Sequence, residues 1–107
     1  MMAARVSISD RAEADLVNQY RWYTENASNE MAETFLNAFD EAVDTLSRFP
    51  KLGRLRQFRA RELSGVRSLA LPRPFDVHLV FYKTTEKRLT IERVMHGARD
   101  LPLRLKE

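Results

Sequence analysis

The apolar side chains between residues 32 and 49 recur at intervals of three and four residues. The positions are Ala32, Phe35, Phe39, Ala42, Leu46 and Phe49. This spacing predicts an α-helix with one apolar face, because a helix completes a turn every 3.6 residues. Pro50 predicts the end of the helix, since its ring cannot continue the backbone hydrogen bonding. Leu36 and Val43 widen the apolar face, so we expect the helix to make a second contact.

A second helical pattern comes earlier in the chain. The apolar positions are Ala12, Leu16, Tyr20, Tyr23 and Ala27. They predict a helix that ends near Asn26. Ser9 or Asp10 can cap this helix and Ser28 can cap the next one, because short polar side chains accept hydrogen bonds from the first free backbone amides. The alternating residues 5–8 predict a short strand ahead of both helices.

Strands dominate the expectation for the second half of the chain. Residues 51–61 are predicted to form a basic loop, and residues 66–71 form a strand that prolines terminate. Residues 77–82 carry large or β-branched side chains on both faces, which favours a central strand. The polar residues 84–87 have the length of a hairpin connection, and residues 89–95 return antiparallel.

This order of elements indicates an α+β fold. We expect a small, mainly antiparallel sheet with the helical hairpin on one face and the other face open. A chain of 107 residues has the size of one domain, here residues 1–107. It contains no cysteine, which excludes disulfides and thiolate chemistry. The first residues turn polar before any apolar run, so we expect no signal peptide, no membrane span and a cytoplasmic location.

Charge is unevenly distributed along the sequence. Residues 1–50 hold four Lys or Arg against nine Asp or Glu, whereas residues 51–107 hold fourteen against six. The basic second half favours an anionic partner, which can be nucleic acid, the ribosome or an acidic protein segment. A solubilising surface remains an alternative explanation. No cluster has metal-ligand spacing and no glycine-rich phosphate loop is present, so we expect no metal and no cofactor.

The segment 93–100, Arg-Val-Met-His-Gly-Ala-Arg-Asp, is the most specific motif in the chain. It is similar to the R-V-x-H-G-A-R-D signature of ParE-like proteins, and residues 50–54 resemble the P-x-L-G-R turn of the same group. Residues 65–67 resemble the start of that group's second strand. Further matching positions in the helices are Asp15, Leu16, Tyr23, Ala32, Phe35 and Leu46. Most of the chain therefore resembles the RelE/ParE superfamily of type II toxins.

The resemblance implies a toxin that a cognate ParD-like antitoxin neutralises in a toxin–antitoxin hetero-oligomer. Two targets compete. ParE-like members, the plasmid stabilisation toxins, poison DNA gyrase without catalysis, whereas RelE-like members cut messenger RNA in the ribosomal A site. The H-G-A-R-D motif favours the ParE branch. A third possibility is a degenerate member that has lost toxicity and only binds a partner.

The RelE-like alternative needs a base, an acid and positive charge for the developing phosphorane. Arg99 resembles a phosphate-stabilising arginine of that branch, and Arg67 resembles a basic residue on its second strand. His96 or Tyr82 would move protons, although neither histidine of the chain matches the RelE catalytic set. Residues 101–107 contain neither Tyr nor His. The catalytic set is therefore incomplete, which favours the hypothesis of a gyrase poison over that of an endoribonuclease.

Two groups of residues are candidates for partner contacts. The target-binding candidates are Arg54, Arg56, Arg59, Arg61, Arg67, Arg73 and Arg99. The antitoxin-binding candidates are Leu36, Val43, His78 and Val80. Several of the candidate residues also have a purely structural explanation. His96 can order the turn at Gly97, and the arginines of residues 54–61 can line a solvated loop. Tyr20 and Tyr23 lie on the predicted core face of their helix.

Overall fold

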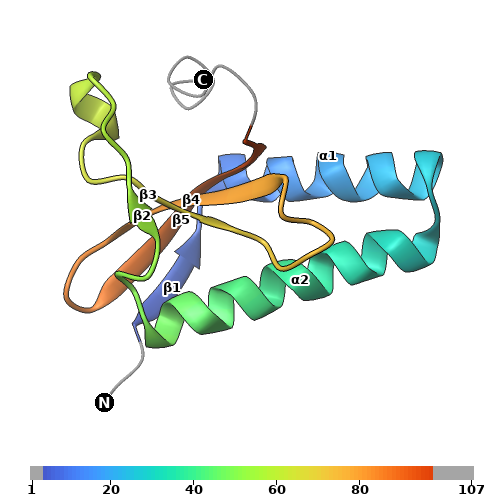
Figure 1. Cartoon of the computed structure of the whole chain (residues 1–107), viewed down its shortest axis with the longest axis horizontal. Helices are drawn as coiled ribbons and strands as arrows, with labels where there is room; N and C mark the ends of the chain where they lie inside the picture. The colour runs from blue at the N-terminus through green and yellow to red at the C-terminus, as the bar shows by residue number, and fades with distance from the viewer. Residues whose placement is uncertain (1–3, 98–107) are drawn as a thin grey trace.

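A computed structural model of the chain describes residues 4–97, and it contains a long helical hairpin beside a twisted sheet (Figure 1). The elements are β1 (Arg5–Ile8), α1 (Asp10–Asn26), α2 (Asn29–Arg48), β2 (Arg54–Leu55), the 3-10 helix η1 (Arg61–Leu63), β3 (Arg67–Ala70), β4 (His78–Thr84) and β5 (Arg88–His96). The strand order is β1-β5-β4-β3-β2. Among the strands of residues 4–97, β1 pairs in parallel with β5 and the other pairs are antiparallel. The predicted α+β architecture is confirmed.

Both helices begin at the serines that the sequence indicated. The hydroxyl oxygen of Ser9 accepts the Ala12 amide at 3.0 Å, and that of Ser28 accepts the Met31 amide at 2.9 Å. The α2 helix ends at Arg48, and Phe49 caps it with its side chain 58% exposed. The expectation that Phe49 belongs to the apolar face is wrong. The backbone leaves the helix just before Pro50 and turns this side chain outward.

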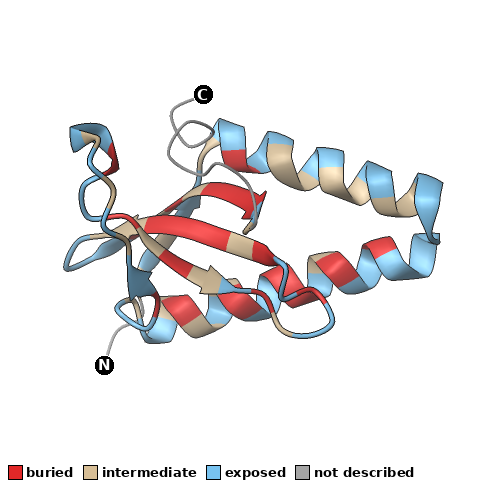
Figure 2. Ribbon diagram, turned by 45° about the horizontal axis from the view of Figure 1, so that its top comes forward, coloured by how far each residue is buried: buried red, intermediate tan, exposed pale blue. Residues whose placement is uncertain are grey.

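The main core lies between the helices and one face of the sheet, as the buried segments of α2, β4 and β5 show in Figure 2. Its largest fully buried side chains are Phe35, Leu46, Leu71, Val80, Tyr82, Leu89 and Ile91, and Phe39 and Phe75 are nearly as buried. The α1 helix is joined to β5 by a largely buried ion pair. Asp15 accepts hydrogen bonds from Nε of Arg93 at 2.8 Å, from Nη2 of Arg93 at 3.0 Å and from the amide of Val94 at 3.0 Å.

A second, smaller core covers part of the opposite face of the sheet. Leu63, Val66, Phe81 and Met95 are buried there, with Phe58 packed against them. The expected basic loop of residues 51–61 contains β2 and leads into η1, and it supplies part of this cover. The expectation of an open second face is therefore corrected. Phe81 and Met95 project away from the helices, and burying them removes apolar surface from water.

The central hairpin follows the predicted boundaries closely. Residues 85–87 connect β4 and β5, one residue fewer than predicted because Thr84 ends β4, and the two strands pair from His78 with His96 to Thr84 with Leu89. The register shifts at one point, because Phe81 pairs with Arg93 and Tyr82 pairs with Ile91. The extra residue is Glu92, whose carbonyl accepts the Ser9 hydroxyl at 2.8 Å. This irregularity ties the start of α1 to the sheet.

Candidate functional site

The turn that follows α2, residues 50–53, is fixed by two side chains from the sheet. The hydroxyl of Tyr82 donates to the carbonyl of Pro50 at 2.7 Å and accepts the amide of Gly53 at 2.8 Å. Nη1 of Arg67 donates to the carbonyls of Lys51 and Gly53 at 3.3 and 2.9 Å. Burial raises the pKa of the Tyr82 hydroxyl above its ordinary value. The hydroxyl therefore stays protonated at neutral pH and keeps its donated bond.

Gly53 is required by this close approach. A Cβ atom built at this position would lie 2.5 Å from the hydroxyl oxygen of Tyr82 and 2.6 Å from a carbon of its ring. Tyr82 is fully buried, so its ring has no free space into which it can move. The glycine of the P-x-L-G-R motif thus has a steric explanation.

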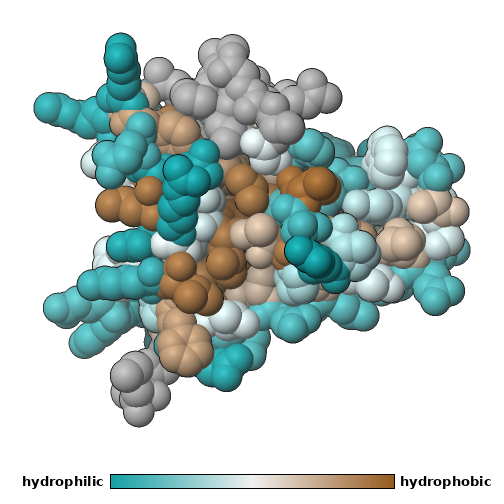
Figure 3. Space-filling model, in the orientation of Figure 1, coloured by the Kyte–Doolittle hydropathy of each residue, from teal (hydrophilic) through white to brown (hydrophobic). Residues whose placement is uncertain are grey.

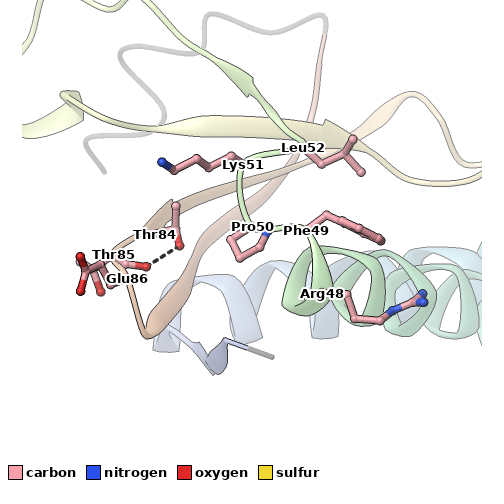
Figure 4. Close-up of a pocket in the computed structure, with 8 residues that line it drawn as sticks. All are labelled: Arg48, Phe49, Pro50, Lys51, Leu52, Thr84, Thr85 and Glu86. Carbon is pink, nitrogen blue, oxygen red and sulfur yellow. Dashed lines mark hydrogen bonds between the residues drawn. The ribbon is translucent and has the colours of Figure 1, made fainter. Parts of the chain in front are cut away.

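A cleft of about 780 Å³ lies between this turn and the β4–β5 connection (Figure 4). Its lining residues are Arg48, Phe49, Pro50, Lys51, Leu52, Thr84, Thr85 and Glu86. Leu52 is 55% exposed, comparable to Phe49. In Figure 4 the side chains of Phe49 and Leu52 extend to the same side, whereas Lys51 extends the other way, towards the hairpin end. We call this cavity the turn cleft.

The arginines near β2 divide into two groups. Arg56 is half-buried, with its guanidinium 5.5 Å from the ring centre of Phe58 and 5.9 Å from that of Phe81. Its Nη1 donates to the Ser68 hydroxyl at 3.1 Å. Burial, followed by the charge of Arg54, lowers the pKa of Arg56. Arg56 therefore supports the second core, as Arg67 supports the turn.

The other predicted cations of this region are exposed. Arg54 lies on β2, Arg59 lies just before η1, Arg61 is the first residue of η1, and Arg73 lies between β3 and β4. Hydrophilic side chains cover this edge of the molecule in Figure 3, around brown apolar groups. The exposed guanidinium groups of Arg54, Arg59 and Arg61, which lie close together in the sequence from β2 to the start of η1, can contact an anionic partner. Arg99 lies outside the described residues.

His78 lies in an aromatic cluster between the helices and the sheet. Its Nε2 is 2.9 Å from the hydroxyl of Tyr23, and its ring centre is 5.2 Å from that of Phe35. Burial, and then the charge of His96, holds the pKa of His78 below its ordinary value. The ring is therefore neutral near pH 7, in a packed site rather than on a free surface.

The four antitoxin-binding candidates occupy different environments. Val80 is fully buried in the main core and offers no surface to a partner, and His78 is nearly as buried. Leu36 and Val43 are half-buried on α2, where they pack against the edge of the core. Of this set, the α2 residues retain accessible surface.

The structure brings Arg67 and Tyr82 together but keeps His96 apart from them. Arg67 pairs with Tyr82 across β3 and β4, whereas His96 pairs with His78. Four residues along β4 correspond to about 13 Å at the usual rise of a strand. The Tyr82 hydroxyl is also bonded to the turn on both sides. These three groups therefore do not form one acid–base site.

Sequence reasoning missed the exposed apolar pair of the turn cleft and the ion pair between α1 and β5. Leu52 had a usable signal, because it is a large apolar residue inside a basic loop and outside every periodic pattern. For residues 4–97, no three His, Cys, Asp or Glu side chains come together in a way that suits a metal ion. No helix in that range is both long and apolar enough to cross a membrane.

Comparison with solved structures defines the class of fold. The structure superimposes with a TM-score of 0.70 on a chain of the chromosomal ParDE toxin–antitoxin system from P. aeruginosa, at 23% identity, covering 88% of this chain and 96% of the other. It also matches the RelBE2 toxin–antitoxin complex from Mycobacterium tuberculosis with a TM-score of 0.57, at 22% identity, covering 92% and 97%. The fold is that of the RelE/ParE toxins. Comparison of the sequence with curated proteins finds no match.

The family follows from the sequence. The family described as the ParE toxin of type II toxin–antitoxin system, parDE, matches residues 6–101, which is most of the chain. The chain belongs to this family, and the expected resemblance to ParE-like toxins is confirmed.

Proposed function

We propose that the chain is a ParE-like toxin that poisons DNA gyrase and is neutralised by a cognate, ParD-like antitoxin. The family match over residues 6–101 carries this proposal. The separation of His96 from Arg67 and Tyr82 supports a mode of action that depends on binding rather than on catalysis. Both the toxin and its target then act in the cytoplasm.

The exposed arginines of β2 and η1 supply the target contact in this proposal. Arg54, Arg59 and Arg61 are free of the packing that holds Arg56 and Arg67, so substituting them leaves both cores intact. Arg73 and Arg99 extend the candidate surface. Positive charge accelerates association with an anionic surface, and this effect weakens as salt screens it.

The antitoxin contact uses a different part of the molecule. Leu36 and Val43 present accessible apolar surface on α2, and an amphipathic helix of the antitoxin can cover it. Acidic groups of the antitoxin then approach the basic strands. The assembly is a toxin–antitoxin hetero-oligomer, of the kind represented by the ParDE and RelBE2 systems.

A cleavage assay tests the function directly. The purified chain is incubated with gyrase, ATP and supercoiled plasmid, and the products are treated with detergent and protease before electrophoresis. We expect linear DNA to accumulate and the cognate antitoxin to prevent it. A triple Arg54→Gln, Arg59→Gln and Arg61→Gln variant should lose this effect, whereas Arg21→Gln, an exposed change on α1, should retain it. Absence of linear DNA with the unmodified chain refutes the proposal.

A ribosome-dependent endoribonuclease is the second candidate. The likeness to the RelBE2 complex and the position of Arg67 beside Tyr82 on the sheet favour it. It predicts cut transcripts when the chain is added to translating ribosomes, with loss of cleavage in Arg99→Ala and His96→Ala. Inactivity in both assays, together with normal growth on induction, would indicate a degenerate member that only binds a partner.

A further inference from the structure

We propose that the turn cleft is a docking site for an acidic segment of a partner protein, which inserts an apolar side chain against Phe49 and Leu52. The inference rests on the proposed function, because the cognate antitoxin is the partner to which it applies first. It adds a second contact region, separate from the Leu36 and Val43 surface of α2.

The first argument is the exposure of large apolar side chains at one place. Phe49 and Leu52 are 58% and 55% exposed, and both line the same cleft. The cleft has room for a large side chain and its neighbours, at about 780 Å³. Contiguous exposed apolar surface with a polar rim is characteristic of protein contact sites. Figure 3 shows brown side chains gathered between β2 and the end of α2.

The second argument is the rigidity of the turn that presents these side chains. Tyr82 and Arg67 hold residues 50–53 through four hydrogen bonds to the backbone. Gly53 packs so closely on Tyr82 that the turn cannot shift inward. A preorganised surface loses little conformational entropy on binding. Tyr82 and Arg67 thus hold the turn in a conformation in which Phe49 and Leu52 stay exposed.

The third argument is the charge around the cleft, which selects the partner's chemistry. The cations Arg48 and Lys51 line the cleft, and Lys87 and Arg88 directly follow its lining residue Glu86 in the chain. The carboxylates there are Glu86 and Asp44, and Asp44 pairs with Arg48 at 3.0 Å, so that these two charges offset each other and Lys51, Lys87 and Arg88 outnumber Glu86. The excess of positive charge favours an acidic partner and disfavours a basic one. A partner segment with an apolar side chain flanked by carboxylates therefore matches the exposed Phe49 and Leu52 and the cations around them.

Affinity measurements on the full chain test this assignment. Binding of the purified cognate antitoxin is measured by isothermal titration calorimetry for the unmodified chain, Phe49→Glu and Leu52→Glu. The matched control is Val77→Glu, since Val77 is 50% exposed and lies just before β4, at the opposite end of that strand from the cleft. We expect each cleft variant to bind at least about tenfold more weakly, and the control to change by less than about threefold.

A second pair of variants tests the charge argument. Lys51→Glu and Lys87→Glu should each weaken binding and reduce its dependence on salt, because each removes a cation that the acidic segment approaches. Circular dichroism and thermal melting serve to check that the variants fold, which we expect because the substituted positions are exposed. Unaltered affinity in both Phe49→Glu and Leu52→Glu overturns the docking site while the proposed function stands. An equal loss in Val77→Glu overturns it too. Failure of the unmodified chain to bind the antitoxin refutes the proposed function itself.

Discussion

Replacing Asp15 with alanine removes one side of the ion pair that joins α1 to β5. The side chains of Arg93 and Asp15 are only 10% and 16% exposed. Asp15 accepts two hydrogen bonds from the Arg93 guanidinium and one from the Val94 amide. The substitution therefore leaves a nearly buried guanidinium without this carboxylate and removes the acceptor of a backbone amide.

The magnitude follows from the burial of the pair. Breaking a buried ion pair by removing one partner costs about 3–5 kcal/mol. Domains of this size are stable by about 5–15 kcal/mol, so a large share of the free energy of unfolding is lost. With a urea dependence of about 2 kcal/mol per molar, the unfolding midpoint should fall by roughly 2 M.

Urea denaturation followed by circular dichroism measures this change. The matched control is Asp44→Ala, which breaks the Arg48–Asp44 pair of the same chemistry, at 3.0 Å, on the exposed side of α2. An exposed pair one helical turn apart contributes about 0–1 kcal/mol, so the control should shift the midpoint little. Equal shifts in the two variants, or a loss below about 1 kcal/mol for Asp15→Ala, would refute the argument from burial.

Three further predictions concern the turn and the aromatic cluster. Gly53→Ala should lower stability by about 1–3 kcal/mol in thermal melts, because its methyl group collides with the Tyr82 ring, and an unchanged melting temperature would contradict this. Tyr82→Phe should cost about 1–3 kcal/mol in urea unfolding, since the Gly53 amide loses its buried acceptor. His78 has a lowered pKa in the folded state, so the unfolded chain binds its proton first on acidification. Stability should be unaffected by this group above about pH 6.5 and should fall below it, towards the folded-state pKa. Urea midpoints across pH should show this decline weakened in His78→Gln, and an identical decline would exclude His78 as its source.

The helices and the central hairpin were predictable because their signals are local. Ser9 and Ser28 act within one turn of their own helix, and the apolar spacing of α2 reports directly on the face that packs. The same local rule failed at Phe49. The apolar spacing in the sequence continues to Phe49, but the helical backbone ends at Arg48, so the Phe49 ring faces solvent instead of the core.

The candidate site was less predictable because its residues act through partners distant in sequence. Tyr82 and Gly53 are 29 positions apart, and no local sequence pattern in either segment predicts their hydrogen bond. Asp15 and Arg93 were recognised only as motif positions, although they are 78 residues apart and form one ion pair. Arg56 and Arg67 read as free cations in the sequence, whereas the structure uses both for packing or support.

The parallel pairing of β1 with β5 has a consequence for how the chain folds as it is synthesised. Residues 5–8 meet residues 88–91, and the hydroxyls of Ser7 and Thr90 lie 3.3 Å apart across a separation of 83 positions. β1 therefore has no strand to pair with until β5 has been made. Contacts of such long range form slowly, because closing the intervening chain costs entropy. We expect the nascent chain to hold a helical hairpin with its apolar face uncovered until β5 leaves the ribosome, so that the sheet can form around β1 only after residues 88–96 have been made.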